Sequence, residues 1–552
     1  MFTAVGGFDS DRFNFHGSAA KGGLRHPRAG KWPRHGFSSR RVALVRLTFL
    51  LFVSLGGPPG VFGAGRASHV VVVVWDGMRP DFVTAELTPN LFRLTQDGVV
   101  FQKHHPVYLS STEVNGTAIA TGMYPNHSGI TGNKEYRPAI DPLKAINTEA
   151  IEAVRKGDRQ TGNHYLERLT VAEQLQAAGY TTAIAGSKPV ALLHDRGERP
   201  ADSPNVTLFE GKTLPTNILA RIVQKQGRFP GTNDSKIEID RWTSQALIGS
   251  LWGEKIPEYS LLWLAEPDFS QHATAPGSAR SKEAIKSSDR NLGLILQALE
   301  AKGLRDQTDI FVVSDHGFST ISKIIDVAAL LREAGFNAAR QFKSAPHPDD
   351  VVVVGNGGAV SLYVIGHGKA TIDRLVKFLQ QSDFAGPIFT REKIKGTFGF
   401  EAANLDSKWE PDITVSLRWS PATSTNGVPG MVICDVNPTY KGTHATLSNF
   451  DLHNTLIAAG PDFRRGLASP IPSGNTDLAP TILWILGVKP AKPMDGRVLT
   501  EALTIAGPKV QVQKPLHLQR NTKIGDRTWR QYLDISRVNK VVYFDEGNAN
   551  LE

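Results

Sequence analysis

Three apolar runs, each followed closely by an acidic residue, constrain the fold of this chain more than any other feature. They are Val70–Val74 before Asp76, Tyr259–Leu264 before Asp268, and Asp309–Val313 before Asp315. Strands that are apolar throughout are typical of a parallel sheet buried on both faces. Such sheets bind their ligands at the carboxyl ends of the strands. We therefore expect the acidic residues to line one binding edge.

Segments with helical spacing of apolar residues separate these runs: Thr88–Gln96, Thr170–Ala178, Ser281–Ala301 and Asn475–Leu486. The alternation predicts an α/β fold with a central, mostly parallel sheet. Residues 134–169 and about 335–435 interrupt it with Gly, Pro, Asn and short β-like runs, and are expected to be insertions or a cap over the active face. We place the catalytic domain at residues 67–505, with the cap at about 335–435, and a polar C-terminal extension at 506–552 with a strand-like Lys540–Phe544.

Positive charge is concentrated at the amino end. The formal net charge is +9, and residues 1–66 carry eight of these charges, because ten Lys or Arg face only Asp9 and Asp11 there. The nearly neutral remainder gives no reason to infer a nucleic-acid-binding surface. A composition of 40% hydrophobic and 21% charged residues is ordinary for a globular enzyme. The single cysteine, Cys434, can form no internal disulfide and lies in a strand-like segment, where packing is its expected role.

Residues 1–66 form a basic leader with the pattern of an export signal. Arg40 and Arg41 precede the apolar Leu47–Leu55, and small residues offer a cleavage site near Ala64. The apolar run is too short to span a bilayer comfortably, so we expect a periplasmic or secreted protein without a transmembrane span in its mature chain. A retained anchor is the alternative. Residues 1–38 fit either a long signal region or a start codon assigned too far upstream.

Seven residues suited to metal binding follow strands or lie in glycine-flanked loops: Asp76, Thr112, Asp268, His272, Asp315, His316 and His444. Carboxylates and imidazoles suit zinc, and two such ions can hold both the attacking and the leaving oxygen of a displacement. Asp268 and His272 are four residues apart, so one helical turn or loop can present both. Asp315 and His316 can converge in a tight turn beside Gly317, or contact two different ions.

Five motifs in this order resemble the alkaline phosphatase superfamily, and within it the type I phosphodiesterase/nucleotide pyrophosphatase family. They are Asp76-Gly77, Thr112, Pro267-Asp268-x-x-x-His272, Ser314-Asp315-His316-Gly317 and Gly442-Thr443-His444. The resemblance implies an alkaline-phosphatase-like three-layer α/β fold, a small-molecule phosphoester substrate and two Zn²⁺ ions, with other divalent ions possible. By matched position, one ion would be held by Asp76, Thr112, Asp315 and His316, and the other by Asp268, His272 and His444.

The resemblance also implies that Thr112 is a nucleophile whose hydroxyl is activated by metal coordination and which forms a phosphothreonine intermediate. Thr112 precedes Glu113–Thr121, an expected helix whose first backbone amides would face the phosphoryl oxygens. A helix-capping role for Thr112 is compatible with this. Asn133 matches a family residue that donates a hydrogen bond to a nonbridging phosphoryl oxygen, although Gly-Asn is also a common turn.

Three further residues bear on the substrate. Trp263 lies where nucleotide-cleaving relatives place a base-stacking tyrosine, with a core role as the alternative. Glu113 stands where those relatives carry Phe, which weakens the nucleotide interpretation and favours a polar or cationic leaving group. Lys188 resembles a lysine of phosphate monoesterases, but Val190 replaces the Arg that those enzymes add two residues later.

The preferred function is therefore cleavage of phosphodiesters or nucleotide pyrophosphates through Thr112. Phosphate monoester hydrolysis and phosphonate hydrolysis on the same site are alternatives. A sulfatase is disfavoured because we find no Cys-x-Pro-x-Arg segment. The alternative from a different class is a catalytically dead binding protein on the same scaffold. The sequence does not indicate an oligomeric state.

Overall fold

The central sheet runs through the strand predicted from Val70–Val74. The computed structural model describes residues 65–552 except 232–234, 254 and 506, and the leader prediction lies outside these residues. Strand β1, His69–Trp75, is buried at every residue and pairs in parallel with β9, Tyr259–Leu264, and β10, Thr308–Val313. The predicted apolar runs are thus three adjacent parallel strands at the centre of the sheet.

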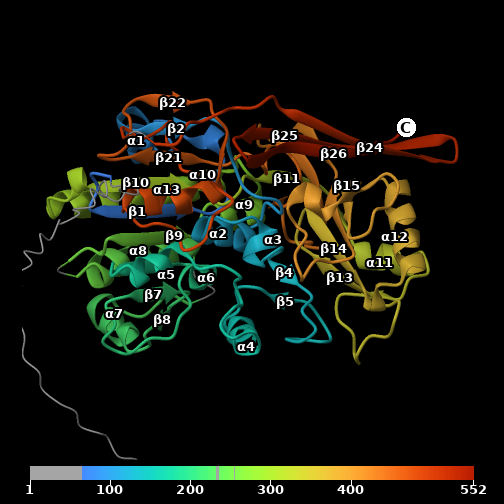
Figure 1. Ribbon diagram of the computed structural model, residues 1–552, viewed down its shortest axis with the longest axis horizontal. Coiled ribbons are helices and arrows are strands. Elements are labelled where there is room, and N and C mark those ends of the chain that lie inside the picture. The colour runs from blue at the N-terminus through green and yellow to red at the C-terminus, as the bar shows by residue number, and fades with distance from the viewer. Residues whose placement is uncertain (1–64, 232–234, 254, 506) are drawn as a thin grey trace, which may run out of the picture. The chain divides into compact units, whose positions relative to one another are not determined.

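Nine strands form this sheet, in the order β22-β2-β21-β10-β1-β9-β6-β7-β8 (Figure 1). The remaining members are β2 Val99–Phe101, β6 Thr182–Gly186, β7 Val206–Phe209, β8 Lys212–Leu214, β21 Leu456–Ala459 and β22 Leu467–Ser469. Five of the eight strand pairs are parallel, and antiparallel pairs involve β21 and the edge strand β8. The predicted mostly parallel sheet is confirmed.

Helices cover both faces of this sheet, because alternate side chains of β1 point to opposite sides. Val70, Val72 and Val74 pack with α2, α5 and α13, whereas Val71 and Val73 pack with α1, α8 and α10. Their bounds are α1 Pro89–Asp97, α2 Thr112–Thr121, α5 Val171–Ala177, α8 Lys236–Ala246, α10 Ala279–Ala301 and α13 Leu478–Ile485. This is a three-layer α/β fold, as predicted.

The segment predicted as a cap forms a second sheet with its own core. Its strand order is β12-β13-β14-β17-β15-β16, and α11 (Val327–Glu333) and α12 (Lys369–Gln381) contribute to the same hydrophobic core (Figure 1). The strand bounds are β12 Ala338–Ala339, β13 Val351–Gly355, β14 Ala359–Val364, β15 Ala385–Thr390, β16 Phe398–Gly399 and β17 Ile413–Leu417. Beside it, β11 Ser319–Ile325, β18 Trp419–Thr423, β19 Pro429–Asp435 and β20 Gly442–Thr443 form a four-stranded sheet. Cys434 is buried in β19, as expected from its strand-like segment.

Residues 134–169 contain a helix that the sequence analysis missed. After the short strands β4, Lys134–Glu135, and β5, Ile146–Asn147, helix α4 spans Ile151–Thr161. Gly157 lies in the middle of this helix, where a side chain would collide with the ring of Tyr165. Close packing therefore explains this glycine, whose helix propensity is poor.

The C-terminal residues form more structure than the expected short strand. Strands β24 Leu516–Ile524, β25 Arg527–Val538 and β26 Val541–Leu551 make an antiparallel sheet (Figure 1). Gln531 binds the backbone of Ile388 in the cap through both its side-chain oxygen and nitrogen, and Trp529 is fully buried against the cap core. Long-range packing therefore orders a segment whose sequence is largely polar. None of the described helices is both long and apolar enough to cross a membrane.

Candidate active site

The carboxyl ends of β1, β9 and β10 bring the predicted ligands together. Asp76 follows β1 directly, Asp268 begins helix α9 (Asp268–Thr274) after β9, and Asp315 follows β10. The three strands are parallel neighbours, so their ends meet at one edge of the sheet. All three aspartates are buried.

The first group of donor atoms surrounds Nε2 of His316. This nitrogen lies 3.3 Å from Oδ2 of Asp315, 3.6 Å from Oδ1 of Asp76 and 3.3 Å from Oγ1 of Thr112. Nδ1 of the same ring is 2.9 Å from the carbonyl oxygen of Gly317. A ring that donates from Nδ1 leaves Nε2 free as an electron-pair donor, which is the usual arrangement of a metal-binding histidine.

The second group surrounds Oδ1 of Asp268, which lies 3.3 Å from Nε2 of His272 and 3.7 Å from Nε2 of His444. Asp268 and His272 are one turn apart on α9, one of the two arrangements that their spacing allows. Nδ1 of His272 is 2.9 Å from the carbonyl oxygen of Gly442, and Nδ1 of His444 is 2.9 Å from that of Ser110. Both rings therefore direct Nε2 towards the carboxylate.

These donor atoms fit metal ions. Oδ1 of Asp76, Oδ1 of Asp268 and Oδ2 of Asp315 are buried without a hydrogen-bond partner, an expensive arrangement unless a cation neutralises them. Two sets of side chains converge closely enough to hold an ion: Asp268 with His272 and His444, and Asp76 with Asp268 and His316. The Asp and His groups at this edge of the sheet could therefore hold metal ions.

Burial and neighbouring charges shift the pKa values of Asp76 and Asp268 in opposite directions. Burial and the adjacent Asp315 raise the pKa of Asp76 well above its usual value. Burial also acts to raise the pKa of Asp268, but Lys188, His272 and His444 outweigh it and hold that pKa well below its usual value. Burial and the other two histidines lower the pKa of His444, which keeps its ring neutral, the form that binds metals.

Thr112 is the first residue of α2, so the expected helix from Glu113 begins one residue earlier. Ser111 occupies the helix-capping position and makes no side-chain cap hydrogen bond, so Thr112 is not the cap. Asn133 reaches the same helix end, because the backbone N–H of Glu113 donates to its Oδ1 at 3.1 Å. This contact uses the amide oxygen and leaves the N–H₂ of Asn133 as a donor near the start of α2.

Lys188 follows strand β6 and lies between the two donor groups. Its Nζ is 2.8 Å from Oδ2 of Asp76, 3.2 Å from Oδ2 of Asp268 and 3.5 Å from Oγ1 of Thr112. Arg196, also near Lys188 in sequence, instead pairs with Asp158 and Glu173. The lysine therefore lies at the candidate site, with its charge shared between two carboxylates.

Trp263 requires a correction. Its side chain is fully buried in β9, and its Nε1–H donates to Oδ2 of Asp76 at 2.9 Å. With no face of the indole exposed, it offers no platform for a base, which contradicts the predicted stacking role. The core alternative fits, with the addition that the ring orients a predicted metal ligand.

Glu113 is buried next to Glu149, a residue that the sequence analysis did not single out. Burial and this proximity raise the pKa of Glu113 well above its usual value, and burial also raises the pKa of Glu149. Glu149 lies in an irregular segment with no motif around it, so only the fold reveals the pair. Tyr440 was missed for the same reason, and its ring centroid lies 4.3 Å from that of His272.

Comparisons with known proteins identify the family of this chain. The family model described as type I phosphodiesterase/nucleotide pyrophosphatase matches residues 70–388, more than half of the chain. Venom phosphodiesterase 2 of Crotalus adamanteus is 24% identical over 257 residues, which cover 46% of this chain and 27% of that protein. The chain thus spans about a quarter of the length of this and similar venom relatives. Bis(5'-adenosyl)-triphosphatase enpp4 of Mus musculus is 21% identical over 440 residues, covering 79% of this chain and 81% of that protein.

Solved structures show the same fold. Human ectonucleotide pyrophosphatase/phosphodiesterase 5 superposes with a TM-score of 0.55 at 17% identity, covering 79% of this chain and all of that one. The murine protein, as an inactive variant in complex with AMP, gives a TM-score of 0.56. Because the family model matches more than half of its residues, this chain belongs to the type I phosphodiesterase/nucleotide pyrophosphatase family of the alkaline phosphatase superfamily.

Proposed function

We propose that this protein is a metal-dependent phosphohydrolase that cleaves phosphodiesters or nucleotide pyrophosphates, with Thr112 as its nucleophile. The observation that carries the proposal is the position of Oγ1 of Thr112, 3.3 Å from Nε2 of His316 and at the amino end of α2. On one side of this hydroxyl lie the side-chain atoms that could bind a cation. On the other side lie the free backbone N–H groups at the start of α2. A structural threonine needs neither.

The proposed cofactor is a pair of Zn²⁺ ions, one with Asp76, Thr112, Asp315 and His316 and one with Asp268, His272 and His444. Mixed carboxylate and imidazole donors favour zinc, and other divalent ions remain possible cofactors. When bound, such ions lower the pKa of a coordinated hydroxyl and neutralise the charge of a phosphoryl group.

The chain's own residues supply the remaining steps. Oγ1 of Thr112 attacks phosphorus, the bond to the leaving-group oxygen breaks, and a phosphothreonine remains until water hydrolyses it. Asn133 donates its amide N–H to a nonbridging oxygen, and the first N–H groups of α2 face the same phosphoryl group. Trp263 fixes the Asp76 carboxylate by its hydrogen bond.

The contacts of Lys188 bear on the choice between diesters and monoesters. A monoester dianion brings one more negative charge than a diester, and a free cation would be needed to bind it. Here the ammonium lies within 3.2 Å of both Asp76 and Asp268, which already share its charge. Its distance of 3.5 Å from Oγ1 of Thr112 supports monoester hydrolysis as the second candidate. Phosphonate hydrolysis would use the same groups.

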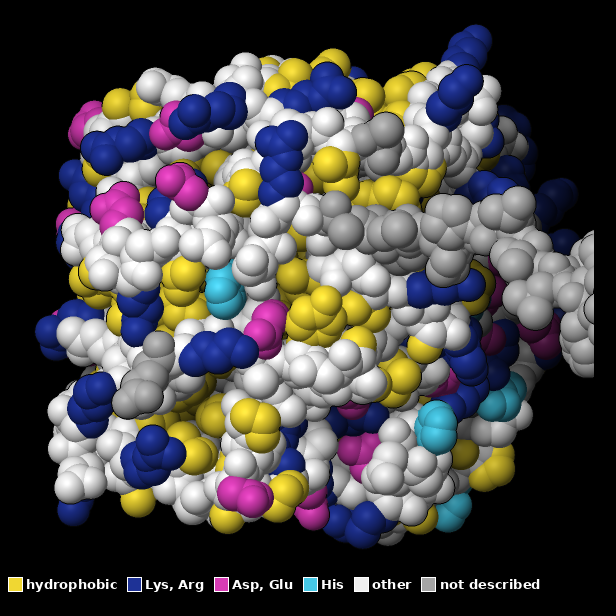
Figure 2. All heavy atoms as spheres, turned by 60° about the vertical axis from the view of Figure 1, so that its left-hand side comes forward, with side chains coloured by type: hydrophobic (Ala, Val, Ile, Leu, Met, Phe, Trp, Pro, Cys, Tyr) yellow, Lys and Arg dark blue, Asp and Glu magenta, His cyan; other side chains and the backbone are white. Residues whose placement is uncertain are grey.

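The activities in the names of two relatives, a phosphodiesterase and a bis(5'-adenosyl)-triphosphatase, agree with small-molecule nucleotide substrates. We infer export from the sequence of the leader and assign no nucleic-acid partner. On the face drawn in Figure 2, cationic and anionic side chains are interspersed over most of the surface.

The decisive experiment compares a nitrophenyl phosphodiester with the matching monoester, using the full chain loaded with zinc and its Thr112→Ala variant. We expect the zinc-loaded wild type to prefer the diester. Diester hydrolysis should fall at least a thousandfold in the variant at equal zinc content, because no phosphothreonine can form without the Thr112 hydroxyl. A preference for the monoester would promote the second candidate. Undiminished hydrolysis by Thr112→Ala would refute the proposed mechanism, and no turnover by the zinc-loaded wild type would favour the binding-protein alternative.

A further inference from the structure

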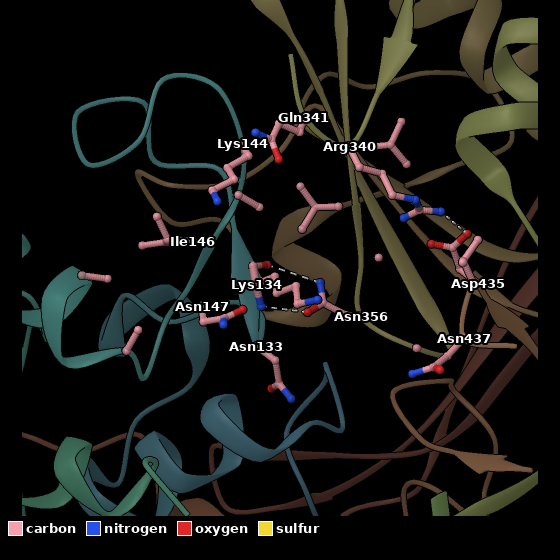
Figure 3. A pocket seen from close by; sticks show the side chains of 18 of the residues that line it. Asn133, Lys134, Lys144, Ile146, Asn147, Arg340, Gln341, Asn356, Asp435 and Asn437 are labelled. Atoms are coloured by element: carbon pink, nitrogen blue, oxygen red, sulfur yellow. Dashed lines mark hydrogen bonds and ion pairs between the residues drawn. The ribbon is translucent and has the colours of Figure 1, made fainter. Parts of the chain in front are cut away.

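A second cavity, of about 880 Å³, lies apart from the candidate active site. The cavity that adjoins the active site is the one drawn in Figure 3, and its lining includes Asn133, His272 and His444. The second cavity shares no lining residue with it. Helix α4 lies between them, because its Lys156 lines the cavity of Figure 3 and its Arg159 lines the second one. Sites for small molecules typically have volumes of roughly 300–1,000 Å³, so the second cavity has a suitable size.

The second cavity lies at the far end of α2 from the proposed nucleophile. Thr112 is the first residue of α2, whereas Met123, which lines the cavity, comes two residues after its last residue, Thr121. A helix of this length extends about 15 Å. None of the predicted metal-binding residues lines the second cavity. A ligand there would therefore bind away from the donor groups of the candidate active site.

Each carboxylate that lines the second cavity is engaged in an ion pair. Four acidic side chains belong to the lining, and three cations pair with them. The pairs are Asp158 and Glu173 with Arg196, each at 3.1 Å, Glu167 with Lys408 at 2.9 Å, and Glu198 with Arg155 at 3.6 Å. These paired groups together carry one net negative charge.

Three further cations line the cavity without a carboxylate partner. Arg159, Arg168 and Lys492 form no ion pair with any residue that the structure describes. Arg159 and Lys492 are exposed. Arg168 donates from Nη1 to the carbonyl oxygen of Glu167 at 2.9 Å, while its Nε is buried without a hydrogen-bond partner among the described residues. These three cations outweigh the single negative charge of the paired groups, so the side chains around the cavity can bind an anion.

Apolar side chains form another part of the lining. Met123 and Leu166 are buried, and Met494 is partly buried. Leu169 is 51% exposed, so a ligand with an apolar body would remove apolar surface from water there. The flexible methionine side chains can adapt to the shape of such a body. The lining therefore combines apolar surface with unpaired cations, which matches a molecule that has an apolar body and an anionic head group.

We propose that the second cavity binds a small amphipathic anion, of which a medium-chain carboxylate is the simplest example. Arg159, Arg168 and Lys492 bind its head group, and Leu169 and Met494 cover its apolar body. The proposed phosphohydrolase reaction uses none of these residues, so this site is an addition to that function. A cationic amphiphile has the wrong charge for the site, and an anion with a short chain lacks the apolar body.

The test measures the binding of decanoate to the full chain by isothermal titration calorimetry, below the micellar concentration of the fatty acid. We expect one decanoate per chain. Its dissociation constant should rise about tenfold in Arg159→Ala and in Lys492→Ala, the scale of a lost charge-assisted hydrogen bond. Butyrate, which has the same head group and a shorter chain, should bind at least about tenfold more weakly. Decyltrimethylammonium, which has the same chain and a positive charge, should show no saturable binding.

Two control variants isolate the effect of charge at this site. Lys489 is exposed, forms no ion pair with a described residue and does not line the cavity, so Lys489→Ala should bind decanoate like the wild type. Arg159→Lys keeps a cation and should retain most of the affinity. The proposal would be overturned by absence of decanoate binding, by unaltered affinity in both Arg159→Ala and Lys492→Ala, by an equal loss in Lys489→Ala, or by equal binding of decyltrimethylammonium.

The Thr112→Ala variant separates this site from the candidate active site. It should bind decanoate with the affinity of the wild type, and a loss of binding would place the ligand at the active site and overturn the proposal. Absence of Thr112-dependent hydrolysis would refute the proposed function alone, because decanoate binding depends on Arg159 and Lys492 and not on the reaction. Both of these side chains are exposed, so their alanine variants should melt within a few degrees of the wild type.

Discussion

Replacing Trp263 with phenylalanine keeps an aromatic ring in β9 but deletes the N–H that donates to Oδ2 of Asp76 at 2.9 Å. If the indole orients a metal ligand, as its position indicates, the variant should bind zinc more weakly. If it were a stacking platform, the phenyl ring would preserve stacking and zinc binding would not change. The two interpretations therefore predict different results for one substitution.

The expected magnitude follows from the contacts of Asp76. A hydrogen bond to a charged group contributes about 1.5–3 kcal/mol, and 1.4 kcal/mol corresponds to a tenfold change in an equilibrium constant. Removing a residue that supports a metal ligand typically lowers affinity by roughly 10- to 100-fold. Oδ2 of Asp76 also accepts from Nζ of Lys188 at 2.8 Å, so it is not left without a partner. We therefore expect the lower end, a loss of zinc affinity of about tenfold.

Zinc affinity is measured by competition with a chromophoric chelator, together with the melting temperature. The matched control is Trp252→Phe, because Trp252 is equally buried and its Nε1–H donates at 2.9 Å to Ser260, which is not a predicted ligand. Both variants should lose stability through the smaller ring, by about 1–3 kcal/mol. Only Trp263→Phe should lose zinc affinity; equal affinity in the two variants would refute the orienting role.

Three other predictions concern catalysis, cofactor and pH. Asn133→Ala should lower kcat on a diester by about a hundredfold, as expected for a lost phosphoryl donor, and a change confined to KM would contradict that role. Removing metal with a chelator should lower the melting temperature and zinc should restore it, because the oxygens of Asp76, Asp268 and Asp315 that lack partners would otherwise stay buried and uncompensated; an unchanged melting temperature would argue against a metal centre. Burial lowers the pKa of His194 to about 3, so below pH 6.5 the unfolded chain takes up a proton that the folded chain does not, and stability falls by up to about 1.4 kcal/mol per pH unit. His194→Phe should therefore flatten the decline in melting temperature between pH 7 and 5, and an unaltered slope would contradict this contribution.

Local patterns were sufficient for the framework of the fold. The apolar Val70–Val74 predicted a central strand because a parallel strand buried on both faces needs apolar side chains at every position. The four-residue spacing of Asp268 and His272 indicated that one loop or helical turn could present both, and the structure has them on one turn of α9. Helix α4 and the C-terminal sheet were not predicted, since Gly157 is explained only by its packing on Tyr165 and the polar β24 only by its pairing with β25.

The ordered motifs likewise identified the ligand candidates and the family from sequence alone. What only the tertiary structure decided is how side chains distant in sequence share one environment. Trp263 became a partner of Asp76 across 187 residues, Lys188 settled between Asp76 and Asp268, and Glu113 met Glu149. Each outcome depends on burial and on the distance between charged groups, and the pairing of strands sets both. A residue's type limits what its side chain can bind, whereas the fold determines which partner comes within reach.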